Sequence, residues 1–449
     1  MNIQILPTPV IILIILSVIY PLQIFGQSSG ARLVVKVENH VRVTSSKFSF
    51  PHFEPHLAIN PTDSDNMLAA SMAVPEEGKG HTIRIYATQD GGETWNHYPI
   101  DTTTVYGGDP WLDFGPDGTA YLVYLPGLIR RSADGGKSWS EPVYLPKGEA
   151  GPFDYPKIIV DKSSAEYKGR IYVVASQSDR PTQEENHVSP IAVLRSLDGG
   201  NTFSFPVHIL PGAINYQNGK PAITSAGNLV VPFNEISKKR RVFLESPRLW
   251  ITWSKNGGKS FDLPRLVAED FIAFQPHLAA DTAGQEFRDR IYAVWSTGSE
   301  FGFNLYSSHT DNNGITWSDT IRVNDGPAYD YTQRPSTAIN KEGVLGLFWM
   351  DTRYDSTAKC FTPFFTATVD GGLSYIKNVP LSKSPSCNDT PSNNIAFSDS
   401  GTTIYDRWSR GGDYFGLAAL PDGNFQVLWS DSKTGTFQLW TARITIRRE

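Results

Sequence analysis

The chain has 449 residues, and 40 Lys and Arg oppose 46 Asp and Glu, so the formal net charge is −6. Aromatic residues make up 12% of the chain and charged residues only 19%, while Gly (38) and Pro (31) are abundant. This mix favours strands and turns over helices, so it predicts an all-β protein. It excludes a disordered chain and a coiled coil, and the mild acidity argues against a nucleic-acid-binding protein.

The N-terminal segment is apolar. Residues 1–26 contain no charged side chain, and Val10–Tyr20 is interrupted only by Ser17. This run is too short to span a bilayer but suits the apolar core of a signal peptide. We expect residues 1–26 to be a cleaved signal peptide, with an uncleaved anchor as the alternative. Residues 27–449 are then expected to form one monomeric domain without a membrane span, secreted, periplasmic or exposed at the cell surface.

One eight-residue motif recurs along the chain, with the form Ser/Thr-x-Asp/Asn-x-Gly-x-Ser/Thr-aromatic. Its six copies, called boxes below, are Thr88–Trp95, Ser132–Trp139, Ser196–Phe203, Ser254–Phe261, Thr310–Trp317 and Thr368–Tyr375. We expect each box to be a tight turn. The Asp or Asn accepts backbone N–H groups, the Gly adopts positive φ, and the aromatic ring packs between repeats. The boxes are therefore predicted to be structural and not catalytic.

A second motif marks the start of a strand, with a polar residue, then Pro, then alternating apolar residues. Its copies are Glu54-Pro55, Asp109-Pro110, Tyr155-Pro156, Lys220-Pro221, Gln275-Pro276, Arg334-Pro335 and, without the Pro, Asp413-Tyr414. There are thus seven strand starts but six boxes, and by spacing the seventh box would fall near residue 449, where the sequence stops.

The spacing also leaves one strand without a partner, Leu33–Val37, and its natural neighbour is the strand around Ile444. Such pairing would remove two exposed sheet edges. The repeats therefore predict a seven-bladed β-propeller of four-stranded antiparallel blades, closed by the N-terminal strand joining the last blade.

The boxes resemble Asp-box repeats, also called bacterial neuraminidase repeats, of sialidases and other secreted carbohydrate-active propellers. The segment Gly227–Phe233, which leads to the fourth box, is also sialidase-like. The resemblance implies an active site on the propeller face opposite the boxes. Sialidases use three Arg, an Asp acid, and a Tyr nucleophile with a Glu partner. Here Phe50–Pro55 lacks the Arg of the sialidase pattern, Gln275 stands where a Glu is expected, and Ala293–Trp295 lacks the following Arg.

The residue before each strand-start Pro is expected to point toward the channel opening opposite the boxes. Around the ring these residues are Glu54, Asp109, Tyr155 with Asp154 beside it, Lys220, Gln275, Arg334 and Asp413. Asp413, Glu54 and Asp109 belong to adjacent blades and would form an acidic arc. Polar groups that converge from several blades suit a ligand site. The alternative is that they only satisfy backbone groups at the strand ends.

Roles can be proposed for some of these residues. Arg334, Arg353 and Arg407 are candidates to clamp a sugar carboxylate or sulfate, because guanidinium binds such groups in a bidentate manner. Asp109 or Glu54 is the candidate general acid, its pKa raised by a like-charged neighbour. By resemblance to sialidases, Tyr331 is the candidate nucleophile or base. The remaining substrate-binding candidates are Lys220, Gln275, Asp154, Tyr155 and Asp413.

Cys360 and Cys387 are the two cysteines, and both fall in long loops on the expected site face. In an exported protein we expect them to form one disulfide, with two free thiols as the alternative. No metal or other cofactor is expected, although the acidic arc leaves Ca²⁺ as an alternative. The basic run Lys238–Arg241 is expected to be a solvated surface, or else a contact for an anionic polysaccharide.

The favoured function is that of an exo-acting glycoside hydrolase on acidic oligo- or polysaccharides. A uronate polysaccharide lyase is one alternative. The other is a non-catalytic propeller that binds glycan or protein at the cell surface, because this fold hosts all three functions.

Overall fold

The structure is a computed structural model that describes residues 33–38, 40–77, 80–100, 107–162, 166–178, 189–209, 215–236, 248–269, 275–284, 286–299, 302–327, 333–355, 357, 359–387, 390, 393–397 and 401–448. The expected signal peptide 1–26, the basic run Lys238–Arg241 and the candidate nucleophile Tyr331 lie outside these residues. In the part of the chain that is described, no helix is both long enough and apolar enough to cross a membrane.

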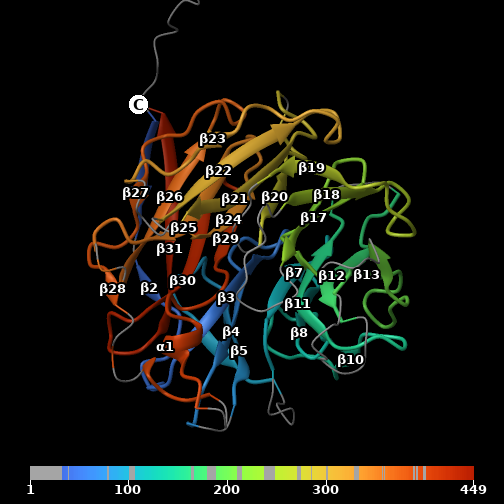
Figure 1. Ribbon diagram of the computed structural model, residues 1–449. Helices are drawn as coiled ribbons and strands as arrows, with labels where there is room; N and C mark the ends of the chain where they lie inside the picture. The colour runs from blue at the N-terminus through green and yellow to red at the C-terminus, as the bar shows by residue number, and fades with distance from the viewer. Residues whose placement is uncertain are drawn as a thin grey trace, which may run out of the picture.

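The described strands form seven antiparallel sheets arranged around a ring (Figure 1). Blade one consists of β3 (His52–Ile59), β4 (Met67–Ala73), β5 (Thr82–Thr88) and β6 (Asn96–Tyr98). Blade two consists of β7 (Trp111–Phe114), β8 (Ala120–Tyr124), β9 (Leu128–Ser132) and β10 (Val143–Tyr144). Blade three consists of β11 (Phe153–Val160), β12 (Ile171–Gln177), β13 (Ile191–Ser196) and β14 (Val207–Ile209).

Blades four to seven are built in the same way. They consist of β15 (Asn215–Asn218), β17 (Leu229–Ile236), β18 (Leu249–Ser254) and β19 (Arg265–Ala268); β20 (His277–Ala280), β21 (Ile291–Ser299), β22 (Gly302–Thr310) and β23 (Ile321–Arg322); β24 (Gln333–Ile339), β25 (Leu345–Asp351), β26 (Cys360–Thr368) and β27 (Val379–Pro380); and β29 (Gly416–Ala419), β30 (Phe425–Asp431), β31 (Gln438–Arg448) and β1 (Leu33–Val37). The predicted fold, a seven-bladed propeller of four-stranded antiparallel blades, is confirmed.

The ring closes as the spacing predicts. Strand β1 is the outermost strand of blade seven and pairs antiparallel with β31, with Val37 opposite Ile444. The two strands lie side by side near the end marked C in Figure 1. Because β1 pairs with β31, the edge of β31 is not left free.

Three blades carry an additional short strand, which the sequence did not predict. Strands β2 (Val41–Arg42), β16 (Ala222–Ile223) and β28 (Ser386–Cys387) pair with β31, β17 and β26. The insertion before blade seven also holds one short helix, α1 (Ile404–Arg407). It begins with a capping box in which Thr403 and Asp406 bond each other's backbone N–H groups. This box fixes the helix start locally.

The core lies between the blades. In one cluster, Tyr121 and Val123 of β8 pack against Ile171 and Val173 of β12. The ring of Phe203, the last residue of the third box, packs against the same cluster. Burial of apolar side chains on both faces of each blade is what holds neighbouring blades together, and the expected inter-blade packing of the box aromatics is found.

The box turns satisfy their own polar groups. In the box Ser132–Trp139, Asp134 accepts the backbone N–H and the hydroxyl of Ser138 at 2.9 and 2.5 Å, and the Gly136 N–H donates to the Ser132 hydroxyl at 2.9 Å. Burial acts in the opposite direction, but these hydrogen bonds lower the pKa of Asp134 to about 2. A carboxylate bonded in this way supports a structural role for the turn.

The two ends of the channel differ. Each inner strand ends near the box turns, as shown by the hydrogen bond from the Gly91 N–H in the first box to the Asp65 carbonyl in the β3–β4 turn, 3.0 Å long. We call this the box end. The inner strands begin at the opposite end, called the mouth, and the candidate residues before the Pro positions therefore lie at the mouth.

Candidate functional site

The mouth is ringed by strained backbone. Five of the residues that precede a strand-start Pro have φ between +49° and +61°, namely Glu54, Asp109, Tyr155, Gln275 and Arg334. This left-handed conformation is unfavourable for residues with a Cβ and is tolerated where surrounding structure enforces it. The strand register shifts at three of these places, beside Glu54, Tyr155 and Arg334. Such bulges change the direction in which side chains point, and here they occur on three blades.

Three acidic groups meet at the mouth, Glu54, Asp109 and Asp154, and we call them the acidic cluster. Burial raises the pKa of Glu54 well above its usual range, and the negative charges of Asp109 and Asp413 add to this effect. Neither Glu54 oxygen accepts a hydrogen bond from another described residue. Burial beside Asp109 thus favours the protonated form of Glu54.

Asp109 is the second carboxyl of this pair. Burial raises its pKa too, but the bond from Glu54, the positive charge of Lys157 and the Tyr155 N–H favour its charged form. That N–H lies 3.1 Å from Asp109 Oδ2. Two buried carboxyls with raised pKa values thus lie next to each other inside the mouth.

Asp154 lies in the same cluster but reaches solvent. Partial burial of its carboxyl, and next the charge of Asp109, raises its pKa to about 7. Asp154 is therefore divided between its protonated and charged forms at neutral pH, with access to whatever enters the mouth.

A second group of charges lies beside the acidic cluster. Arg334 of β24 and Arg407 of α1 each place an Nη2 2.7 Å from a different oxygen of Asp413. Burial alone would raise the pKa of Asp413, but the two guanidinium groups hold it below its usual value. The Arg407 side chain is 41% exposed, and it also lies 3.4 Å from the Tyr155 hydroxyl. The Arg407 guanidinium is thus open to a ligand.

Some polar atoms near these charges have no partner within the described ranges. Arg334 Nε and Nη1 are buried and without a hydrogen bond, and the same holds for both polar atoms of the Gln275 side chain, which is 2% exposed. Buried donors without acceptors are costly. The two residues stand on adjacent blades, so they offer donors for a ligand or for water.

The insertion that carries Arg407 also supports Glu54. The Gly411 carbonyl accepts the Glu54 N–H at 2.9 Å. Gly412, at φ +143°, passes so close that a Cβ there would lie 2.6 Å from the Glu54 nitrogen. Only glycine permits this approach, and the insertion thereby sets the position of a mouth carboxyl.

Lys157 is a mouth residue that the sequence analysis missed. It lies on β11, is 1% exposed, and its Nζ is 5.2 Å from the centre of the Trp111 ring. Burial lowers its pKa to about 8, although the charges of Asp109 and Asp154 act in the opposite direction. The available signal was a lone charged residue within an otherwise apolar stretch of an inner strand.

An aromatic layer lies beneath the mouth. The Trp111 ring is 4% exposed, and its centre lies 3.9 Å from that of His56, 5.4 Å from that of Tyr414 and 6.4 Å from that of His277. Because burial and nearby lysines lower the pKa of His56 and His277 well below the usual value, both rings are neutral. This layer separates the mouth from the channel below it.

Two of the predicted site residues are directed elsewhere. Lys220 donates from Nζ to the Thr337 carbonyl at 2.5 Å and lines the channel on the box side. Arg353 is 2.6 Å from Asp351 and 2.5 Å from Asp325, with its guanidinium over the Phe364 ring. Of the three arginines expected to converge, Arg334 and Arg407 meet at Asp413, while the role of Arg353 as a substrate ligand stays a prediction.

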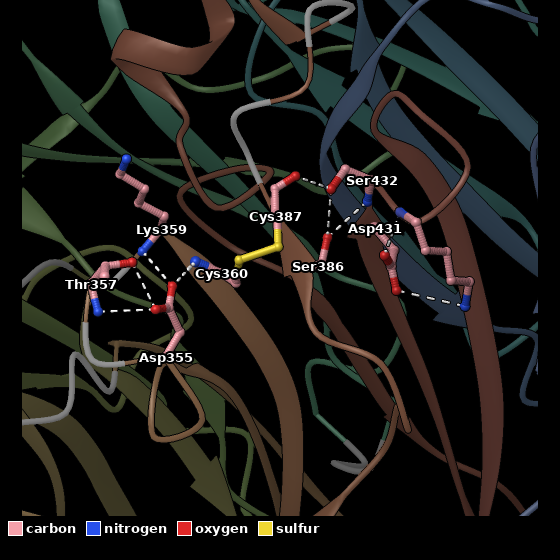
Figure 2. Close-up of a disulfide and its surroundings, with 9 residues drawn as sticks. Asp355, Thr357, Lys359, Cys360, Ser386, Cys387, Asp431 and Ser432 are labelled. Atoms are coloured by element: carbon pink, nitrogen blue, oxygen red, sulfur yellow. Dashed lines mark hydrogen bonds and ion pairs between the residues drawn. A yellow bond between two sulfur atoms is a disulfide. The ribbon is translucent and has the colours of Figure 1, made fainter.

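The predicted disulfide between Cys360 and Cys387 is confirmed, with an S–S distance of 2.09 Å (Figure 2). Asp355 accepts the Cys360 N–H at 2.7 Å, and the Ser432 hydroxyl donates to the Cys387 carbonyl. Figure 2 shows these two residues on opposite sides of the bridge. The disulfide therefore ties the start of the insertion to blade six, next to blade seven.

Among the residues that the structure places, no group of three or more His, Cys, Asp or Glu is arranged to hold a metal ion. The expectation that the protein uses no metal or other cofactor, with Ca²⁺ as the alternative, stays a prediction.

Comparisons with known proteins add a distant similarity. No protein-family model matches the chain. A sialidase of Bacteroides fragilis (strain YCH46) is 28% identical over 162 residues, which cover 30% of this chain and 28% of that protein. The match thus spans less than a third of the sialidase.

Solved structures resemble the whole propeller. A protein of unknown function from Dyadobacter fermentans DSM 18053 has a TM-score of 0.53 at 15% identity, covering 92% of this chain and 99% of its own. A polysaccharide lyase, the PL25 ulvan lyase bound to -[GlcA(1-4)Rha3S]-, has a TM-score of 0.52 at 12% identity, covering 90% and 95%. The chain has a sialidase-like β-propeller fold. At these identities the solved structures support the fold alone.

Proposed function

We propose that the protein is a carbohydrate-active enzyme, an exo-acting glycoside hydrolase that cleaves acidic glycans at the mouth. One observation carries the proposal. Glu54, Asp109 and Asp154 come from three successive blades, and their pKa values are raised to different extents, well above the usual range for Glu54 and to about 7 for Asp154. Glycoside hydrolysis generally uses two carboxyl groups, one protonated and one charged, whose environments separate their pKa values.

The roles follow from the environments. Asp154, with a pKa of about 7 and access to solvent, donates its proton to the glycosidic oxygen as that bond breaks. Charged Asp109 stabilises the anomeric carbon, as nucleophile or as the base that accepts a proton from the attacking water. Water supplies the oxygen and the proton that complete the two products. Burial favours the protonated form of Glu54, which limits the negative charge beside Asp109.

The cationic side of the mouth supports an acidic substrate. Arg407 is partly exposed, and Arg334 and Gln275 have donors without partners among the described residues. Guanidinium donors in a partly dehydrated site favour a carboxylate or sulfate. The partial match to the B. fragilis sialidase agrees with this choice.

Non-catalytic binding of a glycan is the second candidate. The observation in its favour is that Asp413 already pairs with both Arg334 and Arg407. Less positive charge is then left to strain a substrate toward cleavage. A lyase is less well supported by the described tyrosine at the site. Burial and then the charges of Asp413 and Asp154 raise the pKa of Tyr155 well above its usual range, which disfavours it as a base.

The proposal includes export from the cytosol. A disulfide between Cys360 and Cys387 is typical of proteins that mature in an oxidising compartment. Acidic polysaccharides outside the cell are then accessible to the mouth.

The test is to incubate the protein with a panel of sialylated, uronate-containing and sulfated glycans and to analyse the products by chromatography. New free sugar without the ultraviolet absorbance of an unsaturated uronate supports hydrolysis. The variants are Asp109→Asn and Asp154→Asn. Each should lower kcat by about 10²-fold or more, because each removes an acid–base or charge-stabilising group. Asp134→Asn, in a box turn at the other end of the propeller, is the matched control and should act as wild type.

The pH profile gives a second readout. Wild-type activity should fall as pH rises through about 7, where Asp154 loses its proton, and this limb should disappear in Asp154→Asn. Binding without any product, at all pH values and with every glycan, would support the non-catalytic alternative. Unsaturated products would support the lyase.

A further inference from the structure

The propeller has a second hollow, on the other side of the aromatic layer. A cavity of about 490 Å³ occupies the channel at the box end. This volume falls within the range of small-molecule sites. Trp111 and His56 form its inner limit, so it does not belong to the mouth described above.

The wall of this cavity is largely aliphatic. Leu57, Ile159, Ala280, Ile339 and Leu417 come from the inner strands of five different blades and line it together. The inner strands supply these side chains because the innermost strand of each blade runs along the channel. A rigid apolar wall of this kind favours a ligand with an apolar body.

The charged groups of the cavity are mainly cationic. Lys162 is 2.6 Å from Asp113, so that pair is neutral overall. Lys220 and Lys341 also line the cavity, and within the described ranges neither has an acidic partner in an ion pair. Lys220 is the deeper of the two cations, because it stands at a strand start while Lys341 stands on an exposed turn at the box end. The lining therefore carries two uncompensated positive charges.

Lys220 is also held in place. Its Nζ donates to the Thr337 carbonyl at 2.5 Å and lies 3.4 Å from the Thr337 hydroxyl. An ammonium has three N–H donors, so at least one of them remains for a ligand. Bringing a carboxylate to this ammonium would compensate its charge inside the channel, where Coulomb attraction exceeds that in bulk water.

We propose that the box-end cavity is a binding site for a small amphipathic organic acid. Its carboxylate pairs with Lys220, and its aliphatic or aromatic body packs against the wall of inner-strand side chains. The site lies outside the mouth and does not depend on the reaction proposed there. It gives the propeller a second, non-catalytic ligand.

Isothermal titration calorimetry of the full chain tests this, with 3-phenylpropionate and octanoate as probes and their amides as uncharged controls. The acids should bind one per chain, and the amides at least about tenfold more weakly, because they lose a charge-assisted hydrogen bond. Lys220→Met should reduce acid binding to the level of the amides. Lys255→Met, a box lysine paired with Asp262 at the surface, is the matched control and should bind as wild type.

Ala280→Phe should abolish binding of both acids and amides, because the new ring fills the cavity. Ala280→Phe also tests the proposed binding site in the case that Lys220→Met does not fold. Asp109→Asn should leave acid binding unchanged, since the mouth lies beyond Trp111. The proposal is overturned if acids and amides bind equally, if neither acid binds, if binding survives Ala280→Phe, or if it is lost in Asp109→Asn.

Discussion

At the residue scale, two aspartates of the mouth acquire opposite character from their neighbours. Asp413 has two guanidinium partners at 2.7 Å, and these hold its pKa below the usual value in spite of burial. Burial of its carboxyl, and next the charge of Asp109, raises the pKa of Asp154 to about 7. The pKa values of these two aspartates cannot be told apart from residue type alone. The difference between them comes from the neighbours that each one meets where the blade ends come together at the mouth.

The shift of Asp154 makes stability depend on pH. Between about pH 4 and pH 7 the folded protein holds a proton on Asp154 that the unfolded chain releases, so raising pH in this window favours unfolding. Above about pH 7 the loss of folding stability caused by the raised pKa of Asp154 has reached its full size. Asp154→Asn removes it, and the melting temperature of this variant relative to wild type should therefore be higher at pH 8 than at pH 5.

Asp134→Asn is the control for this experiment. The pKa of Asp134 is about 2 in the folded protein and 3.8 ordinarily, so its carboxylate is charged in both states at pH 5 and at pH 8, and the difference between this variant and wild type should be the same at both. A constant difference for Asp154→Asn as well would contradict the raised pKa. Thermal melts followed by circular dichroism at each pH provide the measurement.

The ion pairs of Asp413 lead to a second prediction. Asp413 is 6% exposed and the Arg334 side chain is 10% exposed, so Asp413→Ala leaves a buried guanidinium without its partner. The expected loss is about 3 kcal/mol of unfolding free energy, measured by urea denaturation. Asp262→Ala breaks the exposed pair with Lys255 and should cost less than about 1 kcal/mol. Equal losses in the two variants would refute the buried pairing.

Sequence reasoning placed some of these residues correctly and missed others. The motif before each Pro located Glu54, Asp109 and Asp413 on adjacent blades, because repeat spacing determines blade order. It did not reveal that Lys220 turns toward the box end, since a backbone position does not fix where a long side chain goes. Lys157 was missed because only the residues before Pro156 were taken as site candidates, and Lys157 follows that Pro.

At the element scale, the box turn is the most predictable part of the molecule. Its hydrogen bonds are local, so the motif alone specifies them. The short strands β2 and β28 were not foreseen, because their partners are distant in the sequence. Strand β28 pairs at Cys387 with Cys360 of β26, 27 residues earlier in the chain, and no local pattern encodes that contact.

The boxes differ among themselves at the position of the acidic residue. The fourth box has Asn256 where the second has Asp134, and the Asn256 amide donates to the Ser260 hydroxyl at 2.7 Å. Its Oδ1 still accepts the Ser260 N–H at 3.0 Å. Asp134→Asn should therefore change the unfolding free energy by less than about 0.5 kcal/mol. Asp134→Ala loses the acceptor altogether and should cost about 1–2 kcal/mol, as measured by urea denaturation. The idea of a shared turn geometry fails if the two variants are equally destabilised.

At the scale of the whole molecule, the ring holds the mouth residues together only while it is closed. Blade seven supplies Asp413, and blade one, which follows it around the ring, supplies Glu54. The closing sheet joins β1 to β31 over five residue pairs, from Leu33–Arg448 to Val37–Ile444, and Val35 and Val37 pack against the core of the adjoining blades. Closure therefore supports the site as well as the fold.

Deleting residues 1–38 removes this strand and leaves the edge of β31 without a partner. We expect a loss of about 2–4 kcal/mol in unfolding free energy from the missing backbone bonds and valine burial. We also expect self-association through the exposed edge, detected by light scattering on a sizing column. Deletion of residues 1–26 retains β1 and is the control, with wild-type stability and a monomer expected. If the longer deletion stays monomeric and equally stable, closure by β1 is not what holds blades seven and one together.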